Sequence, residues 1–375
     1  MITRIRVRNY RSLIDVDVQL EPLTVLIGRS GTGKSNFVGA IRALRDVLVG
    51  GNTGIWLANR PFLTPLASLH YSIELKAPNQ SEVYSYELIA DQDCVLNHQY
   101  HPPLLERLSC DGNVVFQKER REWIVKPAVV PEPSTLGIAL RMLNGIREVS
   151  IVLHLLTRGI GCYDFPGNVM QGPSAPNGAA AGYADDGQNY LATTTAILDD
   201  IGRYNEWLSM TRTLSTLNPA ITAVDIASPN RDDLRLAYRG KNGVVLSNTR
   251  LESEGFRRFF ATLLALYQSP HKPLAIFEHP EHAIHPGALE TLANEFKRHV
   301  KRNRGQVILT THNPQFLDYF EPEQIRVVTS AHHETKIGPL ASDQLAAIRD
   351  NLLNPGELLT VDPARLEGQL DEVFS

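Results

Sequence analysis

The sequence predicts an α/β protein with a mainly parallel core sheet, and three patterns support this prediction. An apolar run at 23–27 precedes a glycine-rich turn, and apolar residues then recur at helical spacing over 36–49. The final third alternates two patterns, helical over 255–267 and 288–301 and extended over 274–277 and 306–311. The first twenty residues alternate apolar and charged side chains, which predicts two antiparallel strands at 4–8 and 13–20.

The middle of the chain predicts more strands and then a helical lobe. Extended patterns continue over 70–75 and 84–89, and the segment 110–113 predicts a hairpin turn. Helical spacing follows over 136–156 and 190–214, separated by a loop at 171–187 that is rich in Gly, Ala and Pro and is expected to be disordered. We therefore expect three parts: an N-terminal lobe 1–135 with the antiparallel sheet, an inserted helical lobe 136–250, and a C-terminal lobe 251–375.

The strongest motif is Gly28-Arg29-Ser30-Gly31-Thr32-Gly33-Lys34-Ser35, which matches the pattern G-x-x-x-x-G-K-[ST]. Glycines at these places let backbone N–H groups turn inward around a triphosphate, and the helix start adds partial positive charge. Lys34 would reach the β and γ phosphates, and Ser35 would ligand Mg²⁺. The alternative is a chance match by a glycine-rich turn, and the flanking strand and helix argue against it.

Polar residues follow the two strands of the final third. The strand at 274–277 leads into Glu278, at the place where such nucleotide-binding proteins put the acid that holds Mg²⁺ through water. The next strand leads into Thr310-Thr311-His312-Asn313-Pro314. Upstream, Ser253-Glu254-Gly255 opens a helix. A second anion site is possible there, because a helix start exposes amide groups.

In these motifs the chain resembles the ABC-type ATPases of the SMC, RecF and OLD group, and most closely the single-chain AAA-21 or AAA-15 ATPases. The family pattern N-[FY]-[KR]-S is matched by Asn9 to Ser12, and G-x-N-x-x-G-K-S-N by Gly28 to Asn36, with Ser30 in place of Asn. The pattern D-G-x-N-L is matched by 186–190, except that Tyr190 replaces Leu. The signature, acidic and histidine motifs follow in family order, so the resemblance covers nearly the whole chain.

The resemblance implies a P-loop NTPase fold with an ABC-ATPase-like head, and ATP and Mg²⁺ as its ligands. It also implies a head-to-head homodimer with two ATP molecules between the phosphate loop of one subunit and the Ser253–Gly255 signature of the other. By resemblance, Ser35 and Glu278 are the Mg²⁺ ligands. Nucleotide-binding positions are Arg11, Gly28, Arg29, Ser30, Gly31, Thr32, Gly33, Lys34, Ser35, Asn36, Ser253 and Gly255.

His312 is the expected switch residue that contacts the γ phosphate or the attacking water. Taken alone it is more typical of a polar residue that ends a strand, and the surrounding Thr-Thr-His-Asn-Pro motif favours the functional interpretation. One departure from the family concerns His279, which stands where the catalytic Glu is usual. An imidazole accepts a proton but lacks the carboxylate's fixed charge, so we expect weak ATP hydrolysis. Glu281 is the other nearby carboxylate, either compensating for the missing Glu or merely part of the turn.

Basic residues leave two interpretations open. Arg4, Arg6 and Arg8 alternate on one strand face, which fits a phosphate-contacting DNA surface and a solvated face equally well. The basic cluster over 297–304 is more typical of a helix end that complements its dipole. A formal charge of -4 denies any strong global attraction to nucleic acid.

Several classes of protein are not supported. Composition is that of an ordinary globular protein, with 43% hydrophobic residues and no run able to span a membrane, and the first residues lack a signal peptide's apolar region. We therefore expect a cytoplasmic protein without a membrane partner. Three separated cysteines support neither disulfides nor zinc. Prolines and missing heptads argue against an SMC coiled-coil arm, and about sixty residues after His312 are too few for the Toprim nuclease domain of OLD proteins.

Three functions remain. We favour an ATPase that dimerises on ATP and controls a separate effector, a nuclease or toxin, in DNA repair or anti-phage defence. A second possibility is a nearly inactive, ATP-locked clamp or sensor that holds a partner in an assembly, because of His279. The third, a nucleotide-binding subunit of a transporter, is disfavoured by the acidic and Thr-Thr-His-Asn-Pro motifs.

Overall fold

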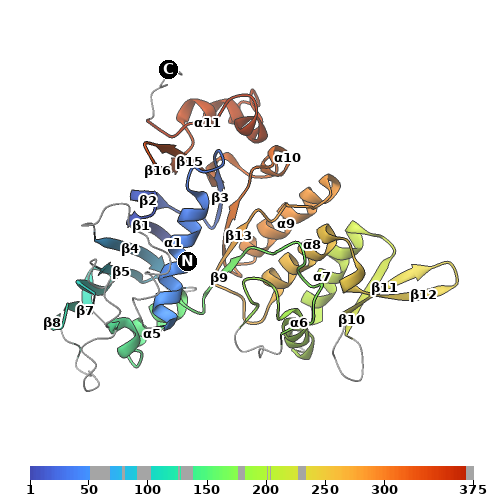
Figure 1. The fold of residues 1–375 in the computed structure, drawn as a ribbon, viewed down its shortest axis with the longest axis horizontal. Helices are drawn as coiled ribbons and strands as arrows, with labels where there is room; N and C mark the ends of the chain where they lie inside the picture. The colour runs from blue at the N-terminus through green and yellow to red at the C-terminus, as the bar shows by residue number, and fades with distance from the viewer. Residues whose placement is uncertain are drawn as a thin grey trace. The chain divides into compact units, whose positions relative to one another are not determined.

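The computed structural model describes residues 1–50, 68–77, 81–90, 103–125, 127, 138–175, 182–200, 202, 204–226 and 234–368 (Figure 1). These residues form two compact units, one made of 1–160 with 321–375 and the other of 161–320, and each is described by itself. Residues 176–181 of the loop expected to be disordered lie outside the described part. The division of the chain at residues 135 and 250 stays a prediction.

The first unit contains a seven-stranded antiparallel sheet in the order β2-β1-β4-β5-β6-β7-β8. Its strands are β1 (Ile2–Tyr10), β2 (Leu13–Gln19), β4 (Leu69–Lys76), β5 (Val83–Ala90), β6 (Leu105–Cys110), β7 (Asn113–Glu119) and β8 (Glu122–Val125). The predicted N-terminal strand pair, the next two strands and the hairpin at 110–113 are thus confirmed.

One face of this sheet carries the core of the unit. Alternate residues of the central strands are buried, as in β4, where Leu69, Tyr71, Ile73 and Leu75 all face inward. Helix α1 (Lys34–Gly50) contacts this sheet, because the Tyr71 hydroxyl donates a 3.0 Å hydrogen bond to the carbonyl of Ala40. The helix that follows the phosphate loop is therefore anchored to a rigid sheet.

A second group of strands in this unit positions the phosphate loop. Strand β3 (Leu23–Ile27) is buried along its whole length and pairs in parallel with β15 (Ile325–Ala331). Strand β16 (Glu334–Pro339) continues this group, antiparallel to β15. Short helices η5 (Pro322–Gln324), α11 (Ser342–Arg349) and η6 (Pro355–Leu359) flank these strands in the sequence.

The helix expected over 136–156 is two helices, α4 (Ala139–Met142) and α5 (Arg147–Leu156). The break falls at Asn144 and Gly145, residues that favour turns over helix interiors. The expected helix over 190–214 is likewise two, α6 (Tyr190–Asp199) and α7 (Tyr204–Leu217) in the second unit. Gly202 lies between them.

The rest of the second unit holds a parallel strand pair and the helices beside it. Strands β13 (Leu274–Glu278) and β14 (Gln306–Thr310) pair in register, with β9 (Ile160–Tyr163) on the other side of β13. Helices α8 (Glu254–Tyr267) and α9 (Leu289–Lys301) precede the two strands in turn, and α10 (Pro314–Leu317) follows β14. The predicted alternation of helix and strand is confirmed, and with it the α/β fold.

A three-stranded antiparallel sheet was not predicted. It consists of β10 (Ile221–Ile226), β11 (Leu234–Gly240) and β12 (Gly243–Asn248), within the region expected to be helical. Asn242-Gly243 at the β11–β12 turn is a standard hairpin signal. The edge strand β12 exposes three apolar side chains, with Val244 at 68%. None of the described helices has the length and apolar character needed to cross a membrane.

Candidate functional site

The phosphate loop lies between β3 and α1 and has no room for side chains at two of its glycines. A Cβ on Gly28 would lie 2.1 Å from the carbonyl oxygen of Val328. One on Gly33, where φ is +108°, would lie 2.0 Å from Oγ1 of Thr335. The loop therefore keeps a conformation that only glycine allows at these places.

Lys34 is the buried cation of this loop. It is 5% exposed, and its Nζ donates hydrogen bonds to the carbonyls of Gly28 and Arg29 at 2.7 and 3.0 Å. Burial lowers the pKa of its ammonium to about 8. An anion at the loop would offset this cost, because a nearby opposite charge favours the charged form.

Other expected nucleotide-binding residues are open to solvent at the loop and at the start of α1. The exposed ones are Arg29, Ser30, Gly31 and Ser35, and the half-buried ones are Gly28, Thr32, Asn36 and Arg11. Because Ser35 lies in the first turn of a 17-residue helix, its hydroxyl and the free amides there suit a phosphate and its metal ion. The residues present thus fit a nucleotide with Mg²⁺.

The Asn-Tyr-Arg-Ser motif supports this loop through a chain of hydrogen bonds. Arg11 donates to Oδ1 of Asn36 at 3.4 Å, and the Asn36 amide donates to Oγ of Ser12 at 2.7 Å. Oγ of Ser12 lies 2.6 Å from Oγ1 of Thr335, which in turn donates to the Thr32 carbonyl at 2.8 Å. Thr335 was missed by the sequence analysis, because 303 residues separate it from the loop that it supports.

In the second unit, Glu278 ends β13 half-buried and in register with Thr310 of β14. The next residue, His279, leaves the strand at φ +47°, and its backbone amide contacts both the carbonyl and the Oγ1 of Thr310. This positive φ is uncommon for a side chain other than glycine and starts a tight turn. The turn carries the next polar residues toward the end of β14.

Glu281 joins the acidic motif to the histidine motif. It is 4% exposed, and its Oε1 accepts hydrogen bonds from the Thr311 hydroxyl at 2.6 Å and the His312 amide at 3.4 Å. Its Oε2 is buried and has no hydrogen-bond partner among the described residues. Glu281 is therefore a buried residue that links the segment after β13 to the segment after β14, rather than a solvated turn residue.

Three imidazole rings lie close together near Glu281. The ring of His279 stacks on His282 with centroids 4.7 Å apart and on His312 with centroids 5.0 Å apart. Nδ1 of His279 lies 3.9 Å from Oε1 of Glu281. His282 is exposed as a residue, yet partial burial of its ring lowers its pKa. His282 was missed, although its spacing of three residues from His279 was a usable signal.

The signature residues open α8 beside a pocket. Oγ of Ser253 accepts a hydrogen bond from the Phe256 amide at 3.3 Å and so caps the helix. A Cβ on Gly255 would lie 2.1 Å from the carbonyl oxygen of Ala283. Ser253, Gly255 and His285 line a pocket of about 410 Å³. The start of α8 is thus packed closely against the segment at Ala283 and is open to the pocket on another side.

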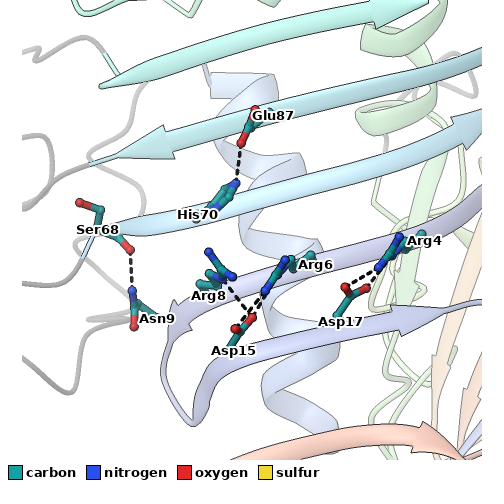
Figure 2. A network of polar contacts seen from close by, with 9 residues as sticks. All are labelled: Arg4, Arg6, Arg8, Asn9, Asp15, Asp17, Ser68, His70 and Glu87. Atoms are coloured by element: carbon teal, nitrogen blue, oxygen red, sulfur yellow. Dashed lines mark hydrogen bonds and ion pairs between the residues drawn. The ribbon is translucent and has the colours of Figure 1, made fainter. Parts of the chain in front are cut away.

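The three arginines of β1 are paired with acids, as Figure 2 shows. Arg4 contacts Asp17 at 2.7 Å, while Arg6 and Arg8 each contact Asp15 at 3.0 Å. The same close-up shows His70 bound to Glu87 and Asn9 bound to the Ser68 carbonyl. Because the carboxylates offset most of the positive charge, this pairing favours a solvated face over a DNA surface.

The structure thus places the candidate residues in two groups, one in each unit. Arg11 and the residues from Gly28 to Asn36 gather in the first unit, and those of the signature, acidic and histidine motifs in the second. Asn189, from the D-G-x-N-like segment, has a structural role, since its side chain bonds the amide of Ala184 and the carbonyl of Gly182.

Comparison with known proteins gives one curated relative and a shared fold. The chain is 22% identical to an OLD nuclease of Thermus scotoductus, over 94% of this chain and 67% of the relative. An SMC head bound to the C-terminal winged-helix domain of ScpA matches 92% of this chain and 99% of its own, at 13% identity and a TM-score of 0.59. An SMC head with an extended coiled coil, bound to ScpA derived from Pyrococcus furiosus, covers 94% and 99% at 11% identity and a TM-score of 0.53.

These similarities agree with the sequence motifs. The SMC heads show the fold, and the predicted membership of the SMC, RecF and OLD group of P-loop ATPases is confirmed. Residues 23–318, most of the chain, match the family described as "AAA domain, putative AbiEii toxin, Type IV TA system". The chain therefore belongs to this AAA_21 family of P-loop ATPases.

Proposed function

We propose that this protein binds ATP with Mg²⁺, hydrolyses it slowly and uses the bound state to control a partner protein. The phosphate loop carries the proposal: a buried lysine ammonium lies over a turn whose glycines leave no room for side chains. Such a loop suits the phosphates of a nucleotide. The order of motifs along the chain, which is that of the family, assigns the loop and the acidic strand to one nucleotide.

Each residue then has a role. Lys34 would neutralise the β and γ phosphates, and Ser35 and Glu278 would hold Mg²⁺. Mg²⁺, when bound, neutralises charge on the phosphate oxygens. His312 contacts the γ phosphate or orients the attacking water.

Slow hydrolysis follows from His279. An imidazole accepts a proton from water but does not supply the negative charge that the usual glutamate supplies. Glu281 is 4% exposed and its Oε1 accepts bonds from Thr311 and His312, so we assign it the role of joining the two motifs rather than that of the missing glutamate. The remaining residues keep hydrolysis possible at a reduced rate.

ATP also brings two copies together in this proposal. The pocket beside Ser253 and Gly255 lies at the start of α8, where free backbone amides favour an anion. The γ phosphate of ATP bound to a partner copy is an anion of the right kind. We further propose a separate effector, a nuclease or toxin acting in DNA repair or anti-phage defence. The words nuclease and toxin occur in the names of the relative and of the family.

ATP turnover tests the catalytic part. With Mg²⁺ as the added divalent ion, in buffer stripped of transition metals, we expect slow turnover that Lys34→Ala and Glu278→Gln abolish. His279→Glu should raise turnover at least tenfold, since general-base effects are typically about 10² to 10⁴ in rate, and ATP affinity should change little. Lower activity in His279→Glu with the fold intact would overturn the assignment of this position.

The near-inactive clamp remains a second candidate, because His279 replaces the catalytic glutamate. Sedimentation with ATP and Mg²⁺ separates the two. A dimer that forms and then dissociates as ATP is consumed supports the ATPase, whereas a dimer that persists with intact ATP supports the clamp. Ser253→Arg should prevent either dimer without abolishing ATP binding. An unchanged mass with and without ATP would contradict both forms of dimerisation.

A further inference from the structure

The turn after β13 brings together two histidines and one glutamate. His279, Glu281 and His282 each offer a ligand atom, and these atoms all lie within 4.8 Å of one another. We propose that these three residues bind a divalent ion of the zinc class, at a site separate from the Mg²⁺ expected at Ser35 and Glu278. The inference goes beyond ATP binding and does not depend on it.

The backbone holds the three residues on one tight turn. The His282 amide donates to the His279 carbonyl at 3.1 Å, and the Ile284 amide donates to the Glu281 carbonyl at 3.1 Å. Ligands around a tetrahedral zinc lie roughly 3.4 Å apart, given bonds of about 2.0 to 2.2 Å. The donor atoms therefore need to close by roughly 1 to 1.5 Å. Rotation of the exposed His282 side chain provides part of this movement.

Two atoms of the cluster point to a missing ligand. Oε2 of Glu281 and Nδ1 of His279 are both buried without a hydrogen-bond partner in the described part of the chain. A buried carboxylate oxygen without a partner is costly, and a bound cation would satisfy it. Glu281 is also held in place, because the Thr311 hydroxyl donates to its other oxygen at 2.6 Å. Such a second contact orients metal-binding carboxylates in known sites.

The donor set selects the ion. Two imidazoles and one carboxylate suit Zn²⁺ and its first-row neighbours, and they leave further positions open for water. Mg²⁺ prefers oxygen ligands and keeps several of its waters, so it is a poor competitor here. The exposed side of His282 gives an ion access from solvent.

The test is a calorimetric titration of the full chain with Zn²⁺, without nucleotide and with Mg²⁺ in large excess. We expect one equivalent to bind. His282→Ala and Glu281→Gln should each weaken binding at least tenfold, since even outer-shell partners of metal ligands are typically worth about 10 to 100 in affinity. The matched control is the double variant His332→Ala/His333→Ala, which removes two adjacent exposed histidines of the β15–β16 turn.

Each outcome decides the proposal. Binding that survives His282→Ala, disappears in the double variant, or is displaced by Mg²⁺ overturns it. His282 is exposed, so its removal keeps the fold, and this variant remains informative even if Glu281→Gln fails to fold. Heat of binding is the readout, so the result is independent of whether the protein hydrolyses ATP.

Discussion

Replacing Gly255 with alanine tests how the signature helix is packed. In a helix interior, alanine is more favourable than glycine by about 1 kcal/mol, so helix propensity alone predicts a gain in stability. The structure predicts the reverse, because the new Cβ would lie 2.1 Å from the Ala283 carbonyl oxygen. Backbone must shift by roughly 1 Å to relieve this contact, and overpacking of this kind costs typically 1 to 3 kcal/mol. With the gain in propensity subtracted, we expect a net loss of about 1 kcal/mol in the free energy of unfolding.

The assay is urea unfolding at 25 °C, followed by circular dichroism. Gly287→Ala is the matched control, because Gly287 lines the same pocket. A Cβ on Gly287 would lie 3.2 Å from its nearest neighbour, Nδ1 of the His285 side chain. The control should lose much less stability than Gly255→Ala. An equally stable or more stable Gly255→Ala protein would refute the packing argument. Sedimentation of the same variant should show impaired ATP-dependent dimerisation, because the start of α8 moves.

Three further predictions concern other sites. Gly33→Ala should lower nucleotide affinity, measured with a fluorescent ATP analogue, far more than Gly31→Ala, which shares a positive φ but has open space around it. Burial, and secondarily Arg304, lowers the pKa of His299 to about 4. The contribution of neutral His299 to the free energy of unfolding is therefore fully present above pH 6.5 and is lost as the pH falls toward 4. Between pH 7.5 and 4.5, the free energy of unfolding in urea should fall by up to about 3 kcal/mol more in the unchanged protein than in His299→Gln. An equal fall in the two proteins would contradict this. Asp15→Asn should cost less than about 1 kcal/mol in the same assay, because its pairs with arginines are exposed, and a larger loss would show that they are structural.

Local features could be predicted from the sequence. The phosphate loop needs glycines at a fixed spacing and a lysine between a strand and a helix, so its chemistry is visible in one short stretch. The N-terminal strands were equally clear, because alternate residues of β1 and β2 face the core and their spacing shows it.

Features that depend on distant residues could not be predicted. Thr335 supports the loop from a strand near the other end of the chain, and Thr311 fixes Glu281 across 30 residues. The sheet of β10 to β12 was missed for a different reason. Helical spacing ends at residue 214, yet the lobe was predicted to be helical as far as residue 250, although Asn242-Gly243 is a hairpin signal beyond that spacing.

The shared oxygen of Glu281 has a thermodynamic consequence. One atom accepts bonds from Thr311 and from the His312 amide, so the ends of β13 and β14 do not move independently. A ligand that shifts this carboxylate also changes the position of the His312 backbone. By linkage, a second ligand that binds at His312 changes the affinity for the first ligand by the same factor by which the first changes the affinity for the second. Cooperativity between the two motifs is therefore reciprocal, and measuring it from either side gives the same coupling free energy.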